Sequence, residues 1–347
     1  MRTPLDPGGR PLGTILVTGA GGAAAVTLLR SFAPHARIIA CDMDPYAVGL
    51  YLARPEDRVV LPRADDPAFL AELLQAAIDH DADLVVPTVD VELLAVAKAR
   101  ETFAGHGITL LVESEQSLRL CLDKAQLVER CAGVVRVPRT VVLTTTTAAD
   151  DLAPLGSPFC VKPRAGAGGR GFAIINSAED LLQVPADGSM IAQEFLPGQE
   201  YSIDVLARPD GHIVATVPRA RDKVDSGIAV AGRTVRSDAL QTFGRDVAQA
   251  IAATTVVNVQ ARLAADGEPA LLEVNPRFPG TMALTQAAGV DMPLLAAEAA
   301  YGRPIPEAVD FVEIAMVRHW HDLAVPVEEY PDPVTRTPLS AGVVGLR

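Results

Sequence analysis

The first 120 residues alternate short apolar runs with longer segments in which apolar residues recur every three or four positions. A short, continuous apolar run is typical of a strand buried on both faces, and the wider spacing is typical of an amphipathic helix. The runs predict strands at 14–18, 36–41, 57–62, 83–87 and 108–112, and the wider spacing predicts helices at 22–33, 67–80 and 91–103, with a short helix near 45–53. This alternation predicts an α/β fold with a doubly wound parallel sheet and helices on both faces.

The pattern changes after Asp123. A helix is expected at 123–132, and Pro138 then prevents a continuous helix because proline lacks the amide hydrogen. Further strands are expected at 158–163, 171–175, 190–195, 200–207, 212–220, 227–235, 256–264, 269–275 and 312–320, and further helices at 238–253, 281–288 and 291–301. Runs of strands followed by helices predict an α+β region. The first dozen residues are expected to form a loose arm.

Composition narrows the class of protein. A chain of 347 residues predicts two or three domains, and with only 4% aromatic residues the core must consist mainly of Ala, Val and Leu. The 43 acidic residues outnumber the 30 basic ones and give a formal net charge of −13, which argues against binding to nucleic acid or to an anionic membrane. Positive charge is therefore expected to be concentrated where an anionic ligand binds.

Cysteine spacing and the longest apolar run indicate the compartment. The four cysteines form no CxxC pair, which is typical of a reducing cytosol and argues against a disulfide scaffold or a zinc ribbon. The longest apolar run, 14–29, has 16 residues, whereas a membrane span needs about 20. Its three glycines also argue against a signal peptide. A cytoplasmic protein is expected.

The glycine cluster after the first strand has two interpretations. Residues 19–24 fit the pattern G-x-G-x-x-A, and Asp42 follows Gly19 by 23 positions, at the end of the second predicted strand. A dinucleotide-binding fold places its ribose-binding acid there, so one interpretation is an NAD(P)-dependent or flavin-dependent oxidoreductase. The other is a tight strand-to-helix turn without a cofactor.

A second glycine cluster lies between two predicted strands. Lys162 ends one strand, and residues 165–171 contain four glycines before the next strand begins. Such a loop can present backbone N–H groups to phosphates, and the lysine supplies a counter-charge. The sequence lacks the pattern G-x-x-x-x-G-K-[ST], so the loop is not a P-loop. Taken alone, it is also consistent with a flexible hairpin.

Carboxylates and amides follow at the ends of later strands. Glu194 and Glu200 flank an apolar elbow that suits an adenine and its ribose hydroxyls. Gln260 is expected to face Glu273 across a hairpin, with Asn275 on the same face as Glu273. These hard oxygen donors suit magnesium, which shares the phosphates of a nucleotide. A lone Glu-x-Asn is more often a hydrogen-bonded strand end.

In this order the motifs resemble the ATP-grasp superfamily, and within it the branch named for the large subunit of carbamoyl phosphate synthetase, which includes carboxylate–amine ligases. The resemblance covers nearly the whole chain. It implies a pre-ATP-grasp domain of dinucleotide-fold shape at 1–120, a small grasp subdomain with a glycine-rich lid at 121–195, and a C-terminal grasp subdomain with the metal site at 196–347. ATP then binds between the later domains, and Gly19 and Asp42 become structural or substrate-facing.

The resemblance also implies roles for individual residues. The implied ATP-binding residues are Lys124, Lys162, Gly166, Gly168, Gly169, Glu194, Phe195, Leu196 and Glu200. The implied ligands of Mg²⁺, with Mn²⁺ as the alternative metal, are Gln260, Glu273 and Asn275. Arg277 and Lys162 would be catalytic, with Arg277 stabilising the transferred phosphoryl group. Many grasp ligases carry an acid where this chain has Gln260, although the carbamoyl phosphate synthetase branch also has glutamine.

The implied reaction is ATP-dependent ligation of a carboxylate to an amine through an acyl phosphate. Arg219 and Arg221 are weaker candidates for binding a substrate carboxylate, and a solvated loop explains them equally well. A non-catalytic nucleotide-binding protein with the same fold is a further alternative. The resemblance also implies a homodimer, and the sequence does not identify the carboxylate or the amine.

Overall fold

The computed structural model describes residues 12–166, 171–225 and 227–331. Its N-terminal part is a five-stranded, wholly parallel sheet in the order β3-β2-β1-β4-β5. The strands are β1 (Thr14–Val17), β2 (Arg37–Asp42), β3 (Arg58–Val60), β4 (Leu84–Val86) and β5 (Thr109–Leu110). The helices are α1 (Ala23–Phe32), α2 (Phe69–Asp79), α3 (Asp90–Lys98) and α4 (Arg100–Ala104), with 3-10 turns η1 (Val48–Leu52) and η2 (Pro55–Asp57).

Alternation along the central strand places apolar side chains on both faces of this sheet. Ile15 and Val17 of β1 pack with α1, and Leu16 packs with α2 and α3 in a separate cluster. The doubly wound parallel sheet predicted from the sequence is therefore confirmed. The prediction of a single helix at 91–103 is wrong. The backbone leaves helical geometry at Ala99, with φ −87° and ψ 7°, and α4 starts after this residue.

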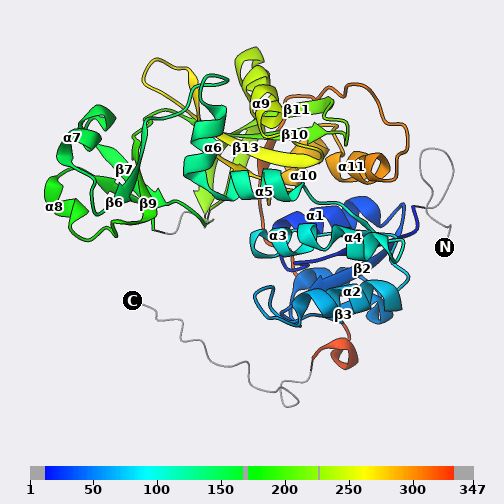
Figure 1. The fold of residues 1–347 in the computed structure, drawn as a ribbon. Helices are drawn as coiled ribbons and strands as arrows, with labels where there is room; N and C mark the ends of the chain where they lie inside the picture. The colour runs from blue at the N-terminus through cyan, green and yellow to red at the C-terminus, as the bar shows by residue number, and fades with distance from the viewer. Residues whose placement is uncertain (1–11, 167–170, 226, 332–347) are drawn as a thin grey trace.

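The remainder consists of two antiparallel sheets. The four-stranded sheet has the order β6-β9-β7-β8 and carries α7 (Ala149–Leu152), η3 (Ala153–Leu155) and α8 (Ala178–Leu181). Its strands are β6 (Thr140–Thr144), β7 (Phe159–Pro163), β8 (Ala173–Ile175) and β9 (Asp187–Glu194). Figure 1 shows this part at the far side of the molecule from the parallel sheet.

The six-stranded sheet, in the order β14-β13-β10-β11-β12-β15, lies between the other two parts (Figure 1). Its strands are β10 (Glu200–Ala207), β11 (Ile213–Asp225), β12 (Ile228–Thr234), β13 (Val256–Leu263), β14 (Pro269–Asn275) and β15 (Ala315–Val317). The associated helices are α9 (Asp238–Ala250), α10 (Met282–Ala287) and α11 (Met292–Ala300). The last strand is three residues long instead of the expected nine, since the chain pairs with β12 only at 315–317.

Two helices join the parts. The helix α5 (Glu115–Leu122), which the sequence pattern did not predict, precedes α6 (Lys124–Cys131). Cys121, Leu127 and Cys131 pack into one core cluster with α9 and the six-stranded sheet. Packing therefore ties α5 and α6 to the sheet of the C-terminal part.

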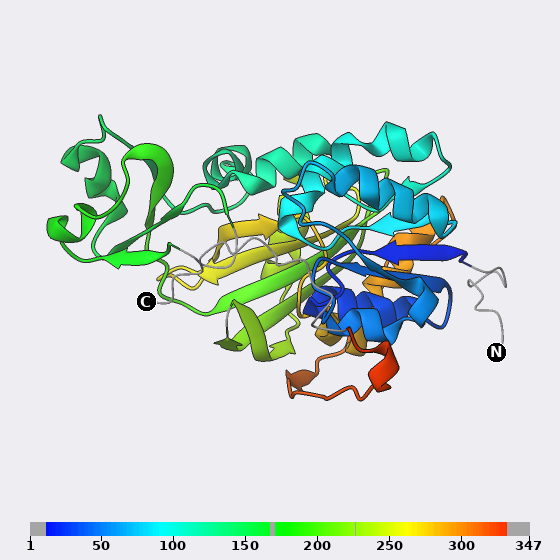
Figure 2. The same cartoon turned by 90° about the horizontal axis from the view of Figure 1, so that it is seen from below.

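The C-terminal segment returns to the parallel sheet. After β15 it passes beside the N-terminal part and forms η4 (Val327–Glu329), drawn red in Figure 2. Arg58 of β3 pairs with Glu329 at 2.7 Å, and the rings of Tyr46 and Tyr330 lie 5.2 Å apart. None of the helices in the described part is long and apolar enough to cross a bilayer. The loose arm expected at the N-terminus falls almost wholly on residues outside the described ranges.

Candidate functional site

A cavity of about 870 Å³ lies where the three sheets meet, and each sheet contributes to its wall. Of the residues for which the resemblance implies a role in binding or catalysis, those lining it are Lys124, Lys162, Gly166, Glu194, Phe195, Leu196, Glu200, Gln260, Glu273, Asn275 and Arg277. The weaker candidate Arg221 also lines it. Gly168 and Gly169, and most of the expected lid, lie outside the described residues. Arg219 does not line the cavity.

Two lysines lie side by side at the junction of the antiparallel sheets. Lys124 begins α6, which Asp123 caps by accepting from the amides of Ala125 and Gln126. Its ammonium group is buried and donates to the carbonyl of Gly166 at 2.7 Å, and it lies 3.8 Å from Glu273 Oε2. This carbonyl contact fixes the lysine at the start of the loop that contains the second glycine cluster.

Lys162 comes from β7 and donates to the carbonyl of Leu272 at 3.3 Å. Desolvation lowers the pKa of Lys162 below its usual value, although Glu273 acts in the opposite sense, and Lys124 adds to the lowering. Two cations and one carboxylate in a partly desolvated wall leave an excess of positive charge. This wall is therefore suited to a polyanion.

The elbow between β9 and β10 is held from both sides. Arg139 donates to Glu194 Oε2 through its side chain at 3.1 Å and through its backbone amide. Desolvation opposes the ionisation of Glu194, but Arg139 outweighs it, and the pKa is held below its ordinary value. Leu196 is buried, and the amide of Gly198 donates to the carbonyl of Leu263 at 2.9 Å. A Cβ at Gly198 would lie 2.6 Å from that carbonyl oxygen, so the approach requires glycine.

Glu200, at the start of β10, is bracketed by two arginines. Arg221 Nε lies 2.9 Å from one carboxylate oxygen, and Arg262 Nη2 lies 3.3 Å from the other. Arg221 also donates to Ser202 Oγ and to the carbonyl of Gly227. Its guanidinium group is thus engaged at the same end of the cavity as Glu200.

The three candidate metal ligands come from neighbouring strands. Gln260 of β13 lies directly opposite Glu273 of β14, so the cross-hairpin pairing expected from the sequence is confirmed. Asn275 lies two residues further on the same face, opposite Asn258. One carboxylate and two amide oxygens at the cavity wall fit a cation such as Mg²⁺, which keeps several of its waters. Within the described ranges no group of three or more His, Cys, Asp or Glu could hold a metal ion.

Arg277 connects the six-stranded sheet to the parallel sheet. Its guanidinium group forms a bidentate pair with Asp90, with Nε and Nη2 each 2.6 Å from a carboxylate oxygen. Asp90 is the first residue of α3, so the pair joins residues 187 positions apart. The sequence pattern did not single out Asp90. The signal available was an acid a few residues after a buried strand, at the edge where parallel strands end.

Arg219 lies beneath the cavity instead of in its wall. It pairs with Asp204 through two nitrogens at 2.9 and 2.6 Å and donates to Thr281 Oγ1. The Arg219 side chain is 2% exposed and that of Asp204 is fully buried. Charge compensation in the interior therefore accounts for this arginine.

The first glycine cluster forms the far end of the cavity. Gly19 has φ +60°, and the amide of Gly21 donates to Asp42 Oδ2 at 2.7 Å. In a dinucleotide-binding turn the second glycine lets the backbone approach the pyrophosphate. Here the amide of Gly21 is already engaged in a hydrogen bond to the Asp42 carboxylate of β2. Below it, buried Glu92 accepts from Thr18 and from the amides of Thr88 and Val89.

Two family models match the chain. One, described as the N-terminal domain of PylC-like proteins, matches residues 15–111. The other, described as ATP-grasp in the biosynthetic pathway with Ter operon, matches residues 187–323. The first covers the parallel sheet, and the second covers the six-stranded sheet and most of its helices.

Relatives and solved structures extend the comparison. The chain is 27% identical over 172 residues to a formate-dependent phosphoribosylglycinamide formyltransferase from a Synechococcus species, covering 48% of this chain and 41% of that protein. It is 24% identical over 267 residues to the carbamoyl phosphate synthase large chain of Xylella fastidiosa, covering 70% and 24%. The chain thus spans less than half the length of either relative.

Among solved structures, a biotin carboxylase from Campylobacter jejuni, described as a β,γ-ATP complex, superposes with a TM-score of 0.71. The identity is 18%, and the match covers 84% of this chain and 72% of that one. At this identity the likeness concerns the fold alone. It confirms the expected arrangement of a parallel N-terminal sheet followed by a mixed α and β grasp region.

Proposed function

Because the chain carries an ATP-grasp domain, we propose that it is an ATP-dependent ligase that activates a carboxylate as an acyl phosphate and joins it to an amine. The resemblance inferred from the order of the motifs is confirmed by the two family models. The observation that carries the proposal is the single cavity that gathers Lys124, Lys162, Glu200, Glu273 and Arg277 from segments far apart in the chain.

In this proposal the nucleotide lies between the two antiparallel sheets. Lys124 and Lys162 bind its phosphates, and the backbone at Gly166 approaches them. The elbow of Glu194, Phe195 and Leu196 receives the adenine, and Glu200 accepts hydrogen bonds from the ribose hydroxyls. The positive wall and the apolar elbow support this orientation because each suits only one end of the nucleotide.

The reaction needs little covalent catalysis by the protein. A carboxylate oxygen attacks the γ-phosphorus and ADP leaves; the amine nitrogen then attacks the acyl carbon, loses a proton, and releases phosphate. Positioning and charge stabilisation dominate chemistry of this type. Gln260, Glu273 and Asn275 would hold Mg²⁺, or Mn²⁺, which when bound neutralises phosphoryl charge. Arg277 would stabilise the transferred phosphoryl group.

The end of the cavity nearest the parallel sheet would receive the carboxylate and the amine. It is lined by backbone at Gly19 and by Asp42, Thr88 and Asp90.

We also retain the division at 1–120, 121–195 and 196–347 as a proposal, with α5 and α6 packing on the third part. The homodimer implied by the resemblance is likewise a proposal, which light scattering of the purified protein tests.

An NAD(P)-dependent oxidoreductase is the second candidate function. The hydrogen bond from Gly21 to Asp42 weighs against it, because it engages the amide and the acid that a dinucleotide would need. A non-catalytic nucleotide-binding protein is the third candidate. The complete set of lysines, oxygen donors and Arg277 at one cavity weighs against loss of activity.

The deciding experiment is a phosphate-release screen over carboxylic acids, with and without amino-acid acceptors, in the presence of ATP and Mg²⁺. The proposal expects release that depends on one carboxylate and rises with one class of amine, together with a condensed product seen by mass spectrometry. Nucleotide binding with no turnover for any pair would favour the non-catalytic alternative.

A further inference from the structure

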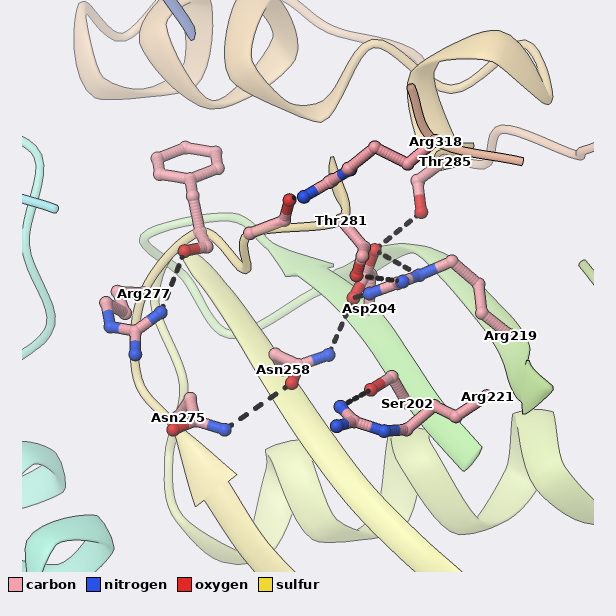
Figure 3. Close-up of polar contacts among 12 residues, drawn as sticks. Ser202, Asp204, Arg219, Arg221, Asn258, Asn275, Arg277, Thr281, Thr285 and Arg318 are labelled. Atoms are coloured by element: carbon pink, nitrogen blue, oxygen red, sulfur yellow. Dashed lines mark hydrogen bonds and ion pairs between the residues drawn. The ribbon is translucent and has the colours of Figure 1, made fainter. Parts of the chain in front are cut away.

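A row of polar side chains crosses the six-stranded sheet and ends in the wall of the cavity (Figure 3). Asp204 of β10 lies directly opposite Asn258 of β13, and Asn258 lies directly opposite Asn275 of β14. Asn258 Nδ2 donates to Asp204 Oδ1 at 2.7 Å, and Asn275 Nδ2 donates to Asn258 Oδ1 at 3.5 Å. The row therefore links a fully buried carboxylate to a candidate metal ligand.

The chemistry of the first member sets the direction of the whole row. A carboxylate can only accept hydrogen bonds, so Asn258 must turn its NH₂ group toward Asp204. Its oxygen then faces the other way and can only accept from Asn275. That leaves Asn275 with its nitrogen on the Asn258 side and its oxygen on the opposite side, as Figure 3 shows.

The orientation of this amide matters for a cation site. The two ends of an asparagine side chain have nearly the same shape, but only the oxygen can ligate a hard cation. Partners outside the first coordination sphere commonly fix such ligands. We propose that Asp204 and Asn258 are positioning residues that hold the amide of Asn275 with its oxygen toward the metal. This inference rests on the proposed function, because it takes Asn275 to be a metal ligand.

Two further residues donate hydrogen bonds to the Asp204 carboxylate. Arg219 supplies the compensating charge through two nitrogens, and Thr285 Oγ1 donates at 2.5 Å. A carboxylate with four donors and a paired cation is stable in the interior, whereas an unpaired one is not. Thr285 contacts the same carboxylate but has no contact in the row that leads to Asn275. It therefore offers a matched control.

The test is direct binding of Mn²⁺ in the presence of ADP, measured by electron paramagnetic resonance on the full chain. Asn258→Leu removes both contacts of Asn258, and we expect the Mn²⁺ dissociation constant to rise about tenfold, within the range seen for outer-sphere partners. Thr285→Val should lower the melting temperature without changing Mn²⁺ affinity. Should Asn258→Leu fail to fold, Asn258→Ser, which is too short to make both contacts, is expected to show the same loss.

A double-variant comparison separates orientation from general damage. In Asn275→Asp both terminal atoms are oxygens, so the orientation of the group no longer matters. Adding Asn258→Leu to Asn275→Asp should then cause no further loss of Mn²⁺ affinity. An equal loss in both backgrounds, or an unchanged affinity in Asn258→Leu alone, would overturn the positioning role. Absence of Mn²⁺ binding by the wild-type protein with ADP would instead overturn the proposed function, and the inference with it.

Discussion

Glu273 supplies the negative charge of the candidate metal site, since its two neighbours in that site are amides. Its carboxylate also lies 3.8 Å from Lys124. Glu273→Gln keeps the shape and removes the charge, so we expect turnover to fall more than tenfold, which corresponds to at least about 1.4 kcal/mol of transition-state stabilisation. The melting temperature should stay close to that of the wild type.

The control for this variant is Glu268→Gln, an exposed position on the same hairpin. It should leave turnover unchanged. If Glu273→Gln retains more than about a tenth of the wild-type rate, Glu273 is not a principal metal ligand.

Some contacts of the candidate site could be predicted from the sequence, and others could not. The pairing of Gln260 with Glu273 could be predicted, because strand alternation and a short hairpin determine it. Asp204 was missed because it appears as one acid in an apolar strand, with its partner Arg219 on the next strand. An acid and an arginine inside strands predicted to be buried were the available signal. The sequence analysis gave Arg219 two equal interpretations, as a substrate-binding residue or as part of a solvated loop. Its side chain is instead buried below the cavity in a pair with Asp204.

At the scale of helices and strands, close packing of α9 on the six-stranded sheet holds the floor of the site in place. Gly244 of α9 is buried, and a Cβ there would lie 2.5 Å from Ile203 Cγ2 and 3.1 Å from Thr216 Cγ2. Gly244→Ala should therefore destabilise the protein by about 1–3 kcal/mol despite the better helix propensity of alanine. Chemical denaturation measures the change.

Gln249→Ala on the exposed side of α9 is the control and should be neutral or slightly stabilising. A Gly244→Ala protein that is more stable than the wild type would show that α9 can move away from the sheet without lowering the free energy of unfolding, contrary to the packing described.

Elements with strong periodicity were predicted well, and short polar ones were not. The helix α5 was missed because 115–122 mixes charged and apolar residues, and its start depends on Ser114 accepting from the amide of Ser117. The strand β11 extends to Asp225 because it continues to pair with β12, which a single strand pattern does not show. Tertiary pairing, which local patterns do not encode, decided the length of β11.

For the whole molecule, the pair Asp90–Arg277 joins the parallel sheet to the grasp region across the cavity. Both side chains are about one-fifth exposed and the geometry is bidentate. Asp90→Asn should lower the free energy of unfolding by about 1–2 kcal/mol, more than loss of an ordinary surface pair. It should also lower kcat more than it changes the KM for ATP, because Arg277 loses its orientation.

Glu115→Gln, which removes an exposed pair with Arg119 on α5, should change stability by less than about 0.5 kcal/mol. Equal stability of Asp90→Asn and Glu115→Gln would mean that the pair across the cavity contributes nothing. The sequence could not indicate this contact, because 187 positions separate its members and no local pattern links them.

The central claim is that a nucleoside triphosphate binds between the antiparallel sheets and that the first glycine cluster binds no dinucleotide. Calorimetric titration of the wild-type protein, Lys162→Ala and Asp42→Ala with ATP and Mg²⁺, and in parallel with NADH, tests it most directly. The account predicts ATP binding that weakens at least tenfold in Lys162→Ala and is unchanged in Asp42→Ala, with no binding of NADH. The account would be contradicted if NADH bound the wild type and not Asp42→Ala, while Lys162→Ala bound ATP as tightly as the wild type.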